Sequence, residues 1–204
     1  MKVEIKDLTT FQNCSDYSIG TVKHYCFNLN LKLHNGINFL LGSVMENGWL
    51  CSYVLAMAKK HSITQGSFYI NDVLVDFNQI KRLSYYINKN EMKLINRKKT
   101  MKRFLYDDKL LLEFNIDSCI KKRRFISLSH WSYLCSCIIG LSRGKQILCF
   151  PWIPNSEVNV QAYRFNLLAE YAKKNDVIVV IPTDAEEHSL RKEVDYDCNI
   201  VIVK

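Results

Sequence analysis

The 204-residue sequence is poor in the two residues that most often interrupt regular structure, with only three prolines and seven glycines. It therefore offers no flexible linker, and its length predicts one domain over 1–204. It also lacks an apolar run close to the roughly 18 residues that a membrane span needs. The first ten residues, MKVEIKDLTT, lack the apolar core of a signal peptide. Together these absences predict a cytoplasmic protein.

Metal and disulfide patterns are also missing, although the chain holds eight cysteines. No CxxC pair occurs, and most cysteines lie in apolar segments, where a reduced thiol packs as a small hydrophobe. Cys135 and Cys137, with His130 nearby, come closest to a metal-ligand spacing. Residues two apart on a helix point to different faces, so we expect no metal site. A nucleophilic pair of Cys135 and His130 is disfavoured too, because a thiol in an apolar helix is inert.

Positive charge is abundant, with a formal net charge of +8. It concentrates at 97–103 (RKKTMKR) and 121–124 (KKRR). Such runs bind nucleic acid or anionic lipid, or form a solvated face. No aromatic-basic repeat of a single-strand binder accompanies them. We therefore expect no nucleic acid partner, and keep anionic lipid as a contact of these segments.

Hydrophobic periodicity predicts strands and helices in alternation. Strands are expected at 27–33, 37–41, 82–87, 145–150, 177–181 (ended by Pro182) and 199–203, with a hairpin at 66–75 turning at Asn71-Asp72. Helices are expected at 49–60, 129–142 (closed by Gly144), 158–174 and 185–194, and in part of 88–124. In 158–174 the apolar face is expected to include Val160 and Tyr163. The second half predicts a parallel sheet covered on both faces, beside an antiparallel layer built by the first third.

The order of these elements, with certain residues, resembles the ATP-binding subunit of an ABC transporter. A turn at 34–36 and a buried strand at 37–41 lead to 46–53, where the family's phosphate loop reads G-E-N-G-x-G-K-S-T. Glu46, Asn47, Gly48 and Ser52 fit this loop. The residues that replace its glycines and lysine are Met45, Leu50 and Cys51.

Further landmarks follow in family order. Residues 66–71 resemble the family hairpin, 84–87 the strand before the glutamine loop, and 139–144 the turn into the Walker B strand. The positions of the signature sequence are held by Leu128, Ser129, His130, Trp131 and Ser132. The Walker B strand corresponds to Ile147, Leu148, Cys149 and Phe150, followed by Pro151 and Trp152 in place of two acids. Residues 182–184 stand where the family has its switch histidine.

The resemblance implies a P-loop-NTPase-like α/β fold with a mostly parallel sheet flanked by helices. It implies a β-rich part with a vestigial phosphate loop at about 1–87, a shortened helical subdomain at about 88–128, and an α/β core at about 129–204. The residues at the vestigial nucleotide site would be Gly42, Glu46, Asn47, Gly48, Trp49, Cys51, Ser52 and Tyr53.

Compared with that family, the substitutions remove the side chains needed for phosphate binding and ATP hydrolysis. A phosphate loop needs glycines for close backbone approach and a lysine for charge, and hydrolysis needs an acid that holds magnesium. Leu50, Cys51, Pro151 and Trp152 supply none of these, and the bulk of Trp131 fills the signature. Ser52 is left either as a magnesium contact or as a helix cap. We therefore expect no catalytic residues and no cofactor, with ATP and magnesium bound at most weakly.

The implied function is a pseudo-ATPase subunit that dimerises with an intact cassette or with itself and couples to a membrane permease, at the inner face of the cell membrane. One alternative is a cassette that still binds ATP weakly, through stacking on Trp49 and through Ser52. The other is a basic nucleic-acid-binding or regulatory module on the same scaffold.

Overall fold

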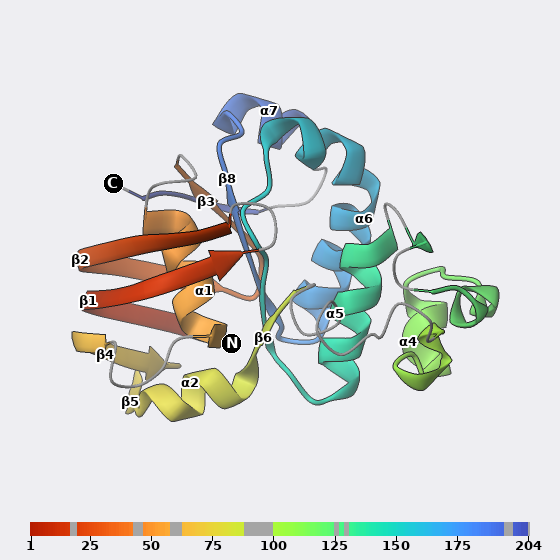
Figure 1. The fold of residues 1–204 in the computed structure, drawn as a ribbon, viewed down its shortest axis with the longest axis horizontal. Helices are drawn as coiled ribbons and strands as arrows, with labels where there is room; N and C mark the ends of the chain where they lie inside the picture. The colour runs from red at the N-terminus through yellow and green to blue at the C-terminus, as the bar shows by residue number, and fades with distance from the viewer. Residues whose placement is uncertain are drawn as a thin grey trace.

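The computed structural model describes residues 1–16, 20–42, 47–57, 63–87, 100–124, 127–128, 131–193 and 198–203, and leaves the side chains of 11–16, 20–27, 47–50, 103 and 193 undescribed. Two sheets build the molecule. Figure 1 shows helix α1 between them and helices α5 and α6 on the far face of the central sheet. None of the described helices is long and apolar enough to cross a membrane.

The central sheet has five strands, all parallel, in the order β6-β7-β8-β3-β9. They are β3 (Gly36–Leu41), β6 (Ser84–Tyr86), β7 (Ile147–Cys149), β8 (Ile178–Thr183) and β9 (Asn199–Ile202). Successive side chains point to opposite faces, and both faces are covered. Phe39 and Val179 thus pack on the α5–α6 side, while Leu40 and Val180 pack on the α1 side.

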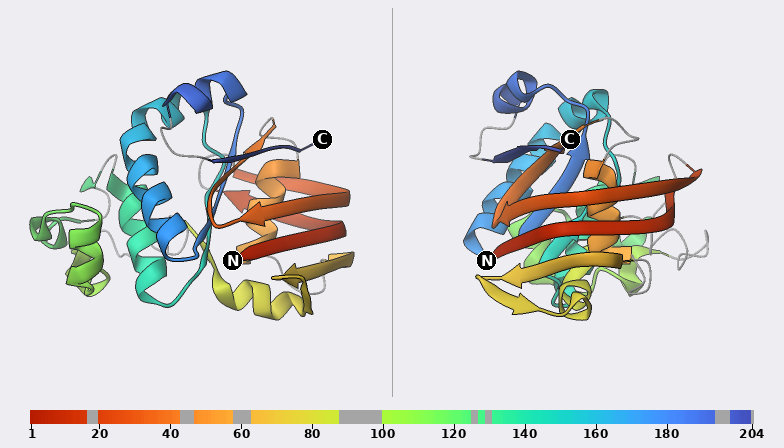
Figure 2. Two further views of the ribbon diagram at one scale, coloured as in Figure 1. Left: turned by 180° about the vertical axis from the view of Figure 1, so that it is seen from behind. Right: turned by 90° about the vertical axis from the view of Figure 1, so that its left-hand side faces the viewer.

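Three helices cover this sheet: α1 (Asn47–Met57) on one face, and α5 (Ser132–Ser142) and α6 (Asn155–Lys174) on the other. Figure 2 shows the same layering from two further sides. Helix α5 can approach the sheet closely because Gly140 faces the ring of Tyr85, where an added Cβ would lie 2.7 Å from Tyr85 Cδ1. The helix ends in a Schellman motif, in which Lys145 N–H donates to the Gly140 carbonyl and Gly144 has a φ of 72°.

The second sheet is antiparallel, in the order β2-β1-β4-β5. Its strands are β1 (Lys2–Asp16), β2 (Gly20–His34), β4 (Ile63–Ile70) and β5 (Val73–Val75). As predicted, the hairpin turns at Asn71 and Asp72, both with positive φ. Gly66 has a φ of 134°, and a Cβ there would lie 3.0 Å from Leu8 Cα, so β1 and β4 meet closely only with glycine at this position.

The remaining elements are short. Helix α2 (Phe77–Leu83) begins in a capping box between Asp76 and Gln79, and α7 (Glu187–Glu193) precedes β9. Residues 100–124 contain the 3-10 helices η2 (Met101–Arg103) and η3 (Ser118–Lys122) and the α-helix α4 (Asp108–Glu113). This segment packs on α6 through the rings of Phe114 and Tyr171, whose centroids lie 4.8 Å apart.

The predicted fold class, a parallel sheet flanked by helices with an antiparallel layer beside it, is confirmed. Several local predictions are wrong. Arg82 and Leu83 belong to α2, and strand β8 continues through Pro182 to Thr183. On α6, Val160 and Tyr163 are exposed, and the buried face is formed by Val158, Gln161, Phe165, Leu168, Ala169 and Ala172.

A buried asparagine fixes the position of strand β3. Asn38 has no exposed surface, and its Nδ2 donates to the carbonyls of His34, Gly36 and Val179. Its Oδ1 accepts from His34 N at 2.9 Å and from Asn199 Nδ2 at 3.0 Å. A buried polar side chain is stable only when its groups are paired, and here the pairing joins β3 to both neighbouring strands.

Candidate functional site

The candidate site lies where the carboxyl ends of β3, β7 and β8 meet at one edge of the parallel sheet. Ligands of open parallel sheets bind at this edge, in the loops that follow the strands. Strand β3 ends at Leu41, Gly42 N–H donates to the Thr183 carbonyl at 3.0 Å, and α1 begins at Asn47. Glu46, one of the predicted site residues, lies outside the described residues.

Most of the predicted phosphate loop is helical. Asn47, Gly48 and Trp49 form the first turn of α1, and the helix continues through Cys51 and Ser52. The helix expected from Trp49 is present and begins two residues earlier, at Asn47, so the residues at positions 47–53 of the resembled loop lie in α1. The family loop depends on several glycines to hold its backbone open, and this stretch has only Gly48, so the helical conformation prevails.

Ser52 is engaged in structure. It is fully buried, and its hydroxyl donates to the Phe150 carbonyl at 2.6 Å, which ties α1 to the end of β7. It lies in the second turn of the helix, so it is not an N-cap, and its oxygen is closed off from solvent. Its neighbours Cys51 and Tyr53 are buried too, and the Tyr53 ring meets that of Tyr86 edge-on at 5.6 Å. These three residues pack as core.

The end of β7 is filled by aromatic rings. Ile147, Leu148 and Cys149 form the strand as expected, and all are fully buried. Phe150 follows them, and its ring lies 5.7 Å from Tyr133 and 5.8 Å from Phe165. Phe165 in turn meets Phe39 of β3 at 6.3 Å. We call Phe39, Tyr133, Phe150 and Phe165 the aromatic cluster. It occupies the end of the strand that corresponds to Walker B.

The two residues after Phe150 complete this wall. Pro151 is buried, and Trp152 is half-buried against the core on the α1 side. Among the described residues, no hydrogen-bond partner reaches the buried indole Nε1 of Trp152. Ile153 N–H donates to the Pro182 carbonyl at 2.8 Å, so the chain continues alongside β8. Neither Pro151 nor Trp152 has a side chain that can coordinate a metal ion or accept a proton.

Leu128 and Trp131, at the signature position, pack against the rest of the protein. Leu128 is buried, Ser132 is the first residue of α5, and Ser129 and His130 lie outside the described residues. The guanidinium carbon of Arg164 lies 4.6 Å from the centre of the Trp131 ring, a cation–π contact between the start of α5 and α6. Partial burial lowers the pKa of Arg164 from its usual value. The face of the Trp131 ring is therefore occupied by Arg164 of the same chain.

The acid at the switch position caps a helix. Asp184 follows β8, and its Oδ1 accepts from Asn155 N at 2.8 Å, at the start of α6, where Pro154 offers no side-chain cap. The Thr183 hydroxyl oxygen accepts from Ala185 N at 3.1 Å. Within the described parts of the chain, no three His, Cys, Asp or Glu side chains gather in a way that could hold a metal ion. Capping accounts for the placement of Asp184.

Two of the cysteines near the core of the central sheet, Cys135 and Cys149, are poor nucleophiles. Burial raises the pKa of the Cys135 thiol to about 12, and it raises the pKa of Cys149 as well. Both thiols are fully buried. A neutral, enclosed thiol does not attack a substrate, since the thiolate is the reactive form.

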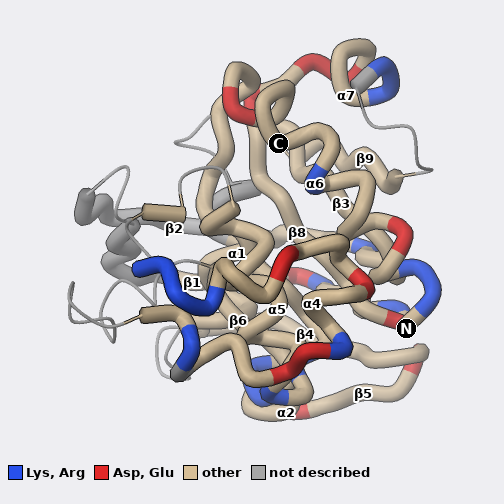
Figure 3. The backbone as a smooth tube through the Cα atoms, turned by 90° about the vertical axis from the view of Figure 1, so that its right-hand side faces the viewer, with Lys and Arg blue, Asp and Glu red and all other residues tan. Residues whose placement is uncertain are grey.

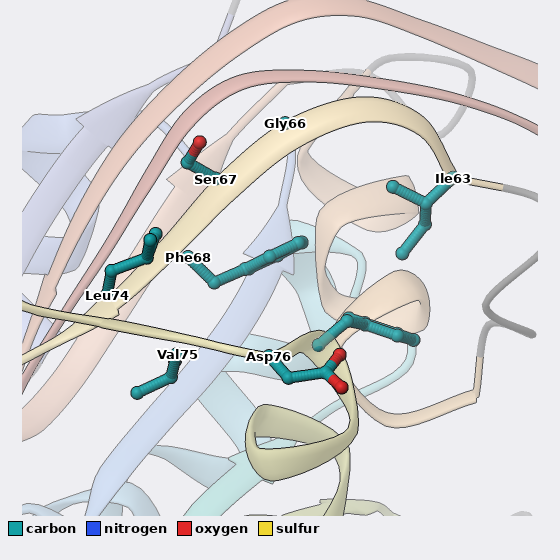
Figure 4. A pocket seen from close by; sticks show the side chains of 8 residues that line it. Ile63, Gly66, Ser67, Phe68, Leu74, Val75 and Asp76 are labelled. Atoms are coloured by element: carbon teal, nitrogen blue, oxygen red, sulfur yellow. The ribbon is translucent and has the colours of Figure 1, made fainter.

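Two clefts lie on the other side of the molecule, away from this edge. The first, about 520 Å³, lies between β4, β5 and α2 (Figure 4) and is lined by Ile63, Gly66, Ser67, Phe68, Leu74, Val75, Asp76 and Phe77. Its single carboxylate, Asp76, takes part in the capping box of α2. The second, about 480 Å³, lies beside Glu4, which pairs with Lys6 and Lys32. Neither cleft has the backbone donors and metal-binding acids that a nucleotide needs.

Comparison with known proteins identifies the fold. No protein-family model matches the sequence, and no curated protein matches it. Among solved structures, the chain is similar to cbiO1 from Clostridium perfringens, part of the ABC transporter complex cbiONQ, with a TM-score of 0.59 and 14% identity over 99% of this chain and 84% of that one. It is also similar to an ATP-binding cassette solved as a dimer in a post-hydrolysis state with ADP and phosphate. There the TM-score is 0.62 and the identity 11%, over 93% of this chain and 90% of that one.

A third structure, the ATP-binding subunit of an ABC transporter, matches with a TM-score of 0.56 and 12% identity, over 100% of this chain and 86% of that one. The chain therefore has the fold of ABC transporter ATP-binding subunits, as the resemblance in its sequence implied. Sequence reasoning did not find the aromatic cluster or the cap formed by Asp184. Phe150 and Asp184 each directly follow a buried strand, which was the signal available.

Proposed function

We propose that this chain is a catalytically degenerate ATP-binding-like subunit of an ABC transporter. Its role would be to pack rather than to hydrolyse. It would pair with an intact cassette or with a second copy of itself, and pass conformational change to a membrane permease. One observation carries the proposal. Ser52 stands at the position of the family's magnesium-binding serine, but it is fully buried and its hydroxyl donates to the Phe150 carbonyl.

The surroundings of that bond support the same conclusion. The aromatic cluster and Pro151 occupy the space after β7, where the family needs acids. Without a metal-holding acid and a phosphate-binding lysine, the transferring phosphoryl group has no electrostatic stabilisation. The fold supports the transporter part of the proposal, because one neighbour is described as part of a transporter complex and another as a dimer.

The subunit would lie at the inner face of the cell membrane, held by the permease, with its basic segments touching anionic lipid. No nucleic acid partner and no bound cofactor are part of it. ATP with magnesium would bind weakly if at all.

Titration calorimetry of the whole chain with Mg-ATP, together with a phosphate-release assay, tests the loss of activity. We expect no binding heat in the micromolar range and no steady release of phosphate. Micromolar binding with steady release would contradict the proposal. Binding without release would favour a cassette that keeps residual nucleotide affinity.

The chain carries its own optical probe for this test, because it has only three tryptophans. Trp49 opens α1, Trp131 precedes α5 and Trp152 follows β7, so all three lie near the candidate site. We expect their fluorescence to stay unchanged on addition of Mg-ATP. If a change occurs, Trp49→Phe separates stacking of the nucleotide on that ring from an indirect effect, with Trp131→Phe as the matched control.

A further inference from the structure

The described parts of the two basic segments of the sequence lie side by side. Thr100 and Arg124 pair in an antiparallel bridge, and Met101 N–H donates to the Arg123 carbonyl at 2.8 Å. The run at 121–124 therefore lies beside the described end of the run at 97–103. Figure 3 shows the lysines and arginines of this part of the chain in blue on the face toward the viewer. Basic residues that are far apart in the sequence thus contribute to the same part of the surface.

Four charged side chains of this surface are exposed: Lys102, Lys122, Arg123 and Arg124, which we call the basic patch. Within the described residues none of the four forms an ion pair. By contrast, Lys121 is neutralised by Asp108.

The acids of the same segment are largely engaged. Residues 100–124 contain seven Lys or Arg and four Asp or Glu, a net charge of +3. Asp107 caps α4, Asp117 caps η3, and Asp108 pairs with Lys121. Positive charge therefore dominates the exposed surface here. An anionic partner would meet little repulsion.

We propose that the basic patch docks the protein on a bilayer that contains anionic lipid. The inference deepens the membrane contact of the proposed function and rests on it for the place of the chain in the cell. Lys and Arg side chains near a negatively charged leaflet are attracted to it, and apolar side chains beside them add a second anchor. The same segment has two exposed side chains with apolar parts, Tyr106 (59% exposed), whose hydroxyl donates to the Ser142 carbonyl, and Leu112 (75% exposed).

The shape of the segment favours a bilayer over a nucleic acid. In Figures 1 and 2 the segment with α4 projects at the end of the molecule opposite the antiparallel sheet. A projecting surface can meet a flat membrane. A protein that binds single-stranded nucleic acid instead uses a groove with aromatic platforms for the bases, and the two clefts described above are lined by residues outside this segment.

Co-sedimentation of the whole chain with vesicles tests the patch. We expect binding to vesicles of phosphatidylcholine and phosphatidylserine, weakened by salt, and no binding to phosphatidylcholine alone. The variant Lys122→Gln/Arg123→Gln/Arg124→Gln keeps the backbone bonds of the bridge and removes three charges. At about fivefold per basic residue, its partition coefficient should fall on the order of 100-fold.

A control variant removes three exposed charges elsewhere, by Arg82→Gln/Lys174→Gln/Lys192→Gln. It has the same net charge as the patch variant, and we expect it to bind vesicles with less than half of that loss on a logarithmic scale. Equal losses in the two variants would overturn the patch in favour of a general charge effect. No vesicle binding by the wild type, or salt-dependent binding of DNA or RNA in its place, would overturn it as well. Neither result affects the outcome of the Mg-ATP titration, so the membrane-docking proposal and the pseudo-ATPase proposal can be rejected independently.

Discussion

The two ends of strand β3 differ in how they use polar groups. Toward its amino end, Asn38 makes five hydrogen bonds in a fully buried position, to the β2–β3 turn, β8 and β9. Beyond its carboxyl end, Ser52 makes one bond to a strand carbonyl, and the space beside it is filled by the aromatic cluster. In a nucleotide-binding sheet the carboxyl edge is the polar one, since phosphate and metal are held there.

The difference indicates where structural constraint acts in this chain. Among the described residues, the buried polar side chains at both ends of β3 join structural elements: Asn38 joins strands, and Ser52 joins α1 to the end of β7. Burying an amide costs free energy unless each of its polar groups is hydrogen-bonded. Asn38 meets this condition through the bonds by which it connects β3 to β8 and β9. Substitutions at the two ends should therefore change stability and leave nucleotide chemistry unaffected.

The largest effect is expected at the carboxyl end, for Phe150→Ala. Phe150 is 1% exposed and its ring touches two others, so the truncation should lower the free energy of unfolding by about 4 kcal/mol. Urea denaturation followed by circular dichroism measures this. Phe150→Leu, which keeps most of the volume, should cost less than half as much. A cost below about 1 kcal/mol for the alanine variant would show that the ring is not part of the core.

Asn38→Ala comes next, at the amino end. Removing the side chain takes one hydrogen-bond partner from three carbonyls, from the His34 N–H and from Asn199 Nδ2, so we expect a loss of about 3 kcal/mol. Asn199→Ala is the matched control, because it removes one partner of Asn38 at a half-buried site; it should cost about 1 kcal/mol. If both variants cost the same, the connector role of Asn38 is wrong.

Ser52→Ala should have the smallest effect of the three. It removes one buried hydrogen bond and leaves a small residue in a helix that tolerates alanine, for a loss of about 1 kcal/mol. Ser142→Ala, which removes a hydroxyl bond to the Ile139 carbonyl within α5, should change stability by less than about 0.5 kcal/mol. The Mg-ATP titration should be the same for Ser52→Ala and wild type. A weaker nucleotide signal in the variant would instead restore Ser52 as a ligand residue.

The fold was predictable because its strongest signals are local. Apolar runs at 37–41 and 177–181 are typical of fully buried strands, and the Asn71-Asp72 pair suits the positive φ of both turn residues. Helix α2 was missed because Phe77 and Ile80 are its only buried positions, too few for a periodic pattern. Its capping box, from Asp76 to Gln79, was the signal that could have found it.

The place of the candidate site was predictable from the sequence, and the contacts of its side chains were not. The order of elements located the edge, and the apolar pattern predicted the helix at 49–60, which begins at Asn47. The bond from Ser52 to the Phe150 carbonyl depends on packing between segments far apart in the sequence. The exposed apolar side chains on α6 illustrate a second limit. Val160 and Tyr163 fit a helical period as well as Val158 and Phe165 do, and the face that is buried is decided by contact with Phe39 on a distant strand. Periodicity alone does not contain that information.

The strand order has a consequence for synthesis on the ribosome. Strand β3 lies between β8 and β9, and the Asn38 contacts reach partners 141 and 161 residues later in the chain. The apolar β3 segment therefore emerges long before either neighbour exists, and its hydrogen-bonding edges stay open meanwhile. Such non-local pairing folds slowly and exposes strands to aggregation. Completion of the central sheet must wait until β9 has been translated, so stalled chains that end before Asn199 are the species that would need a chaperone.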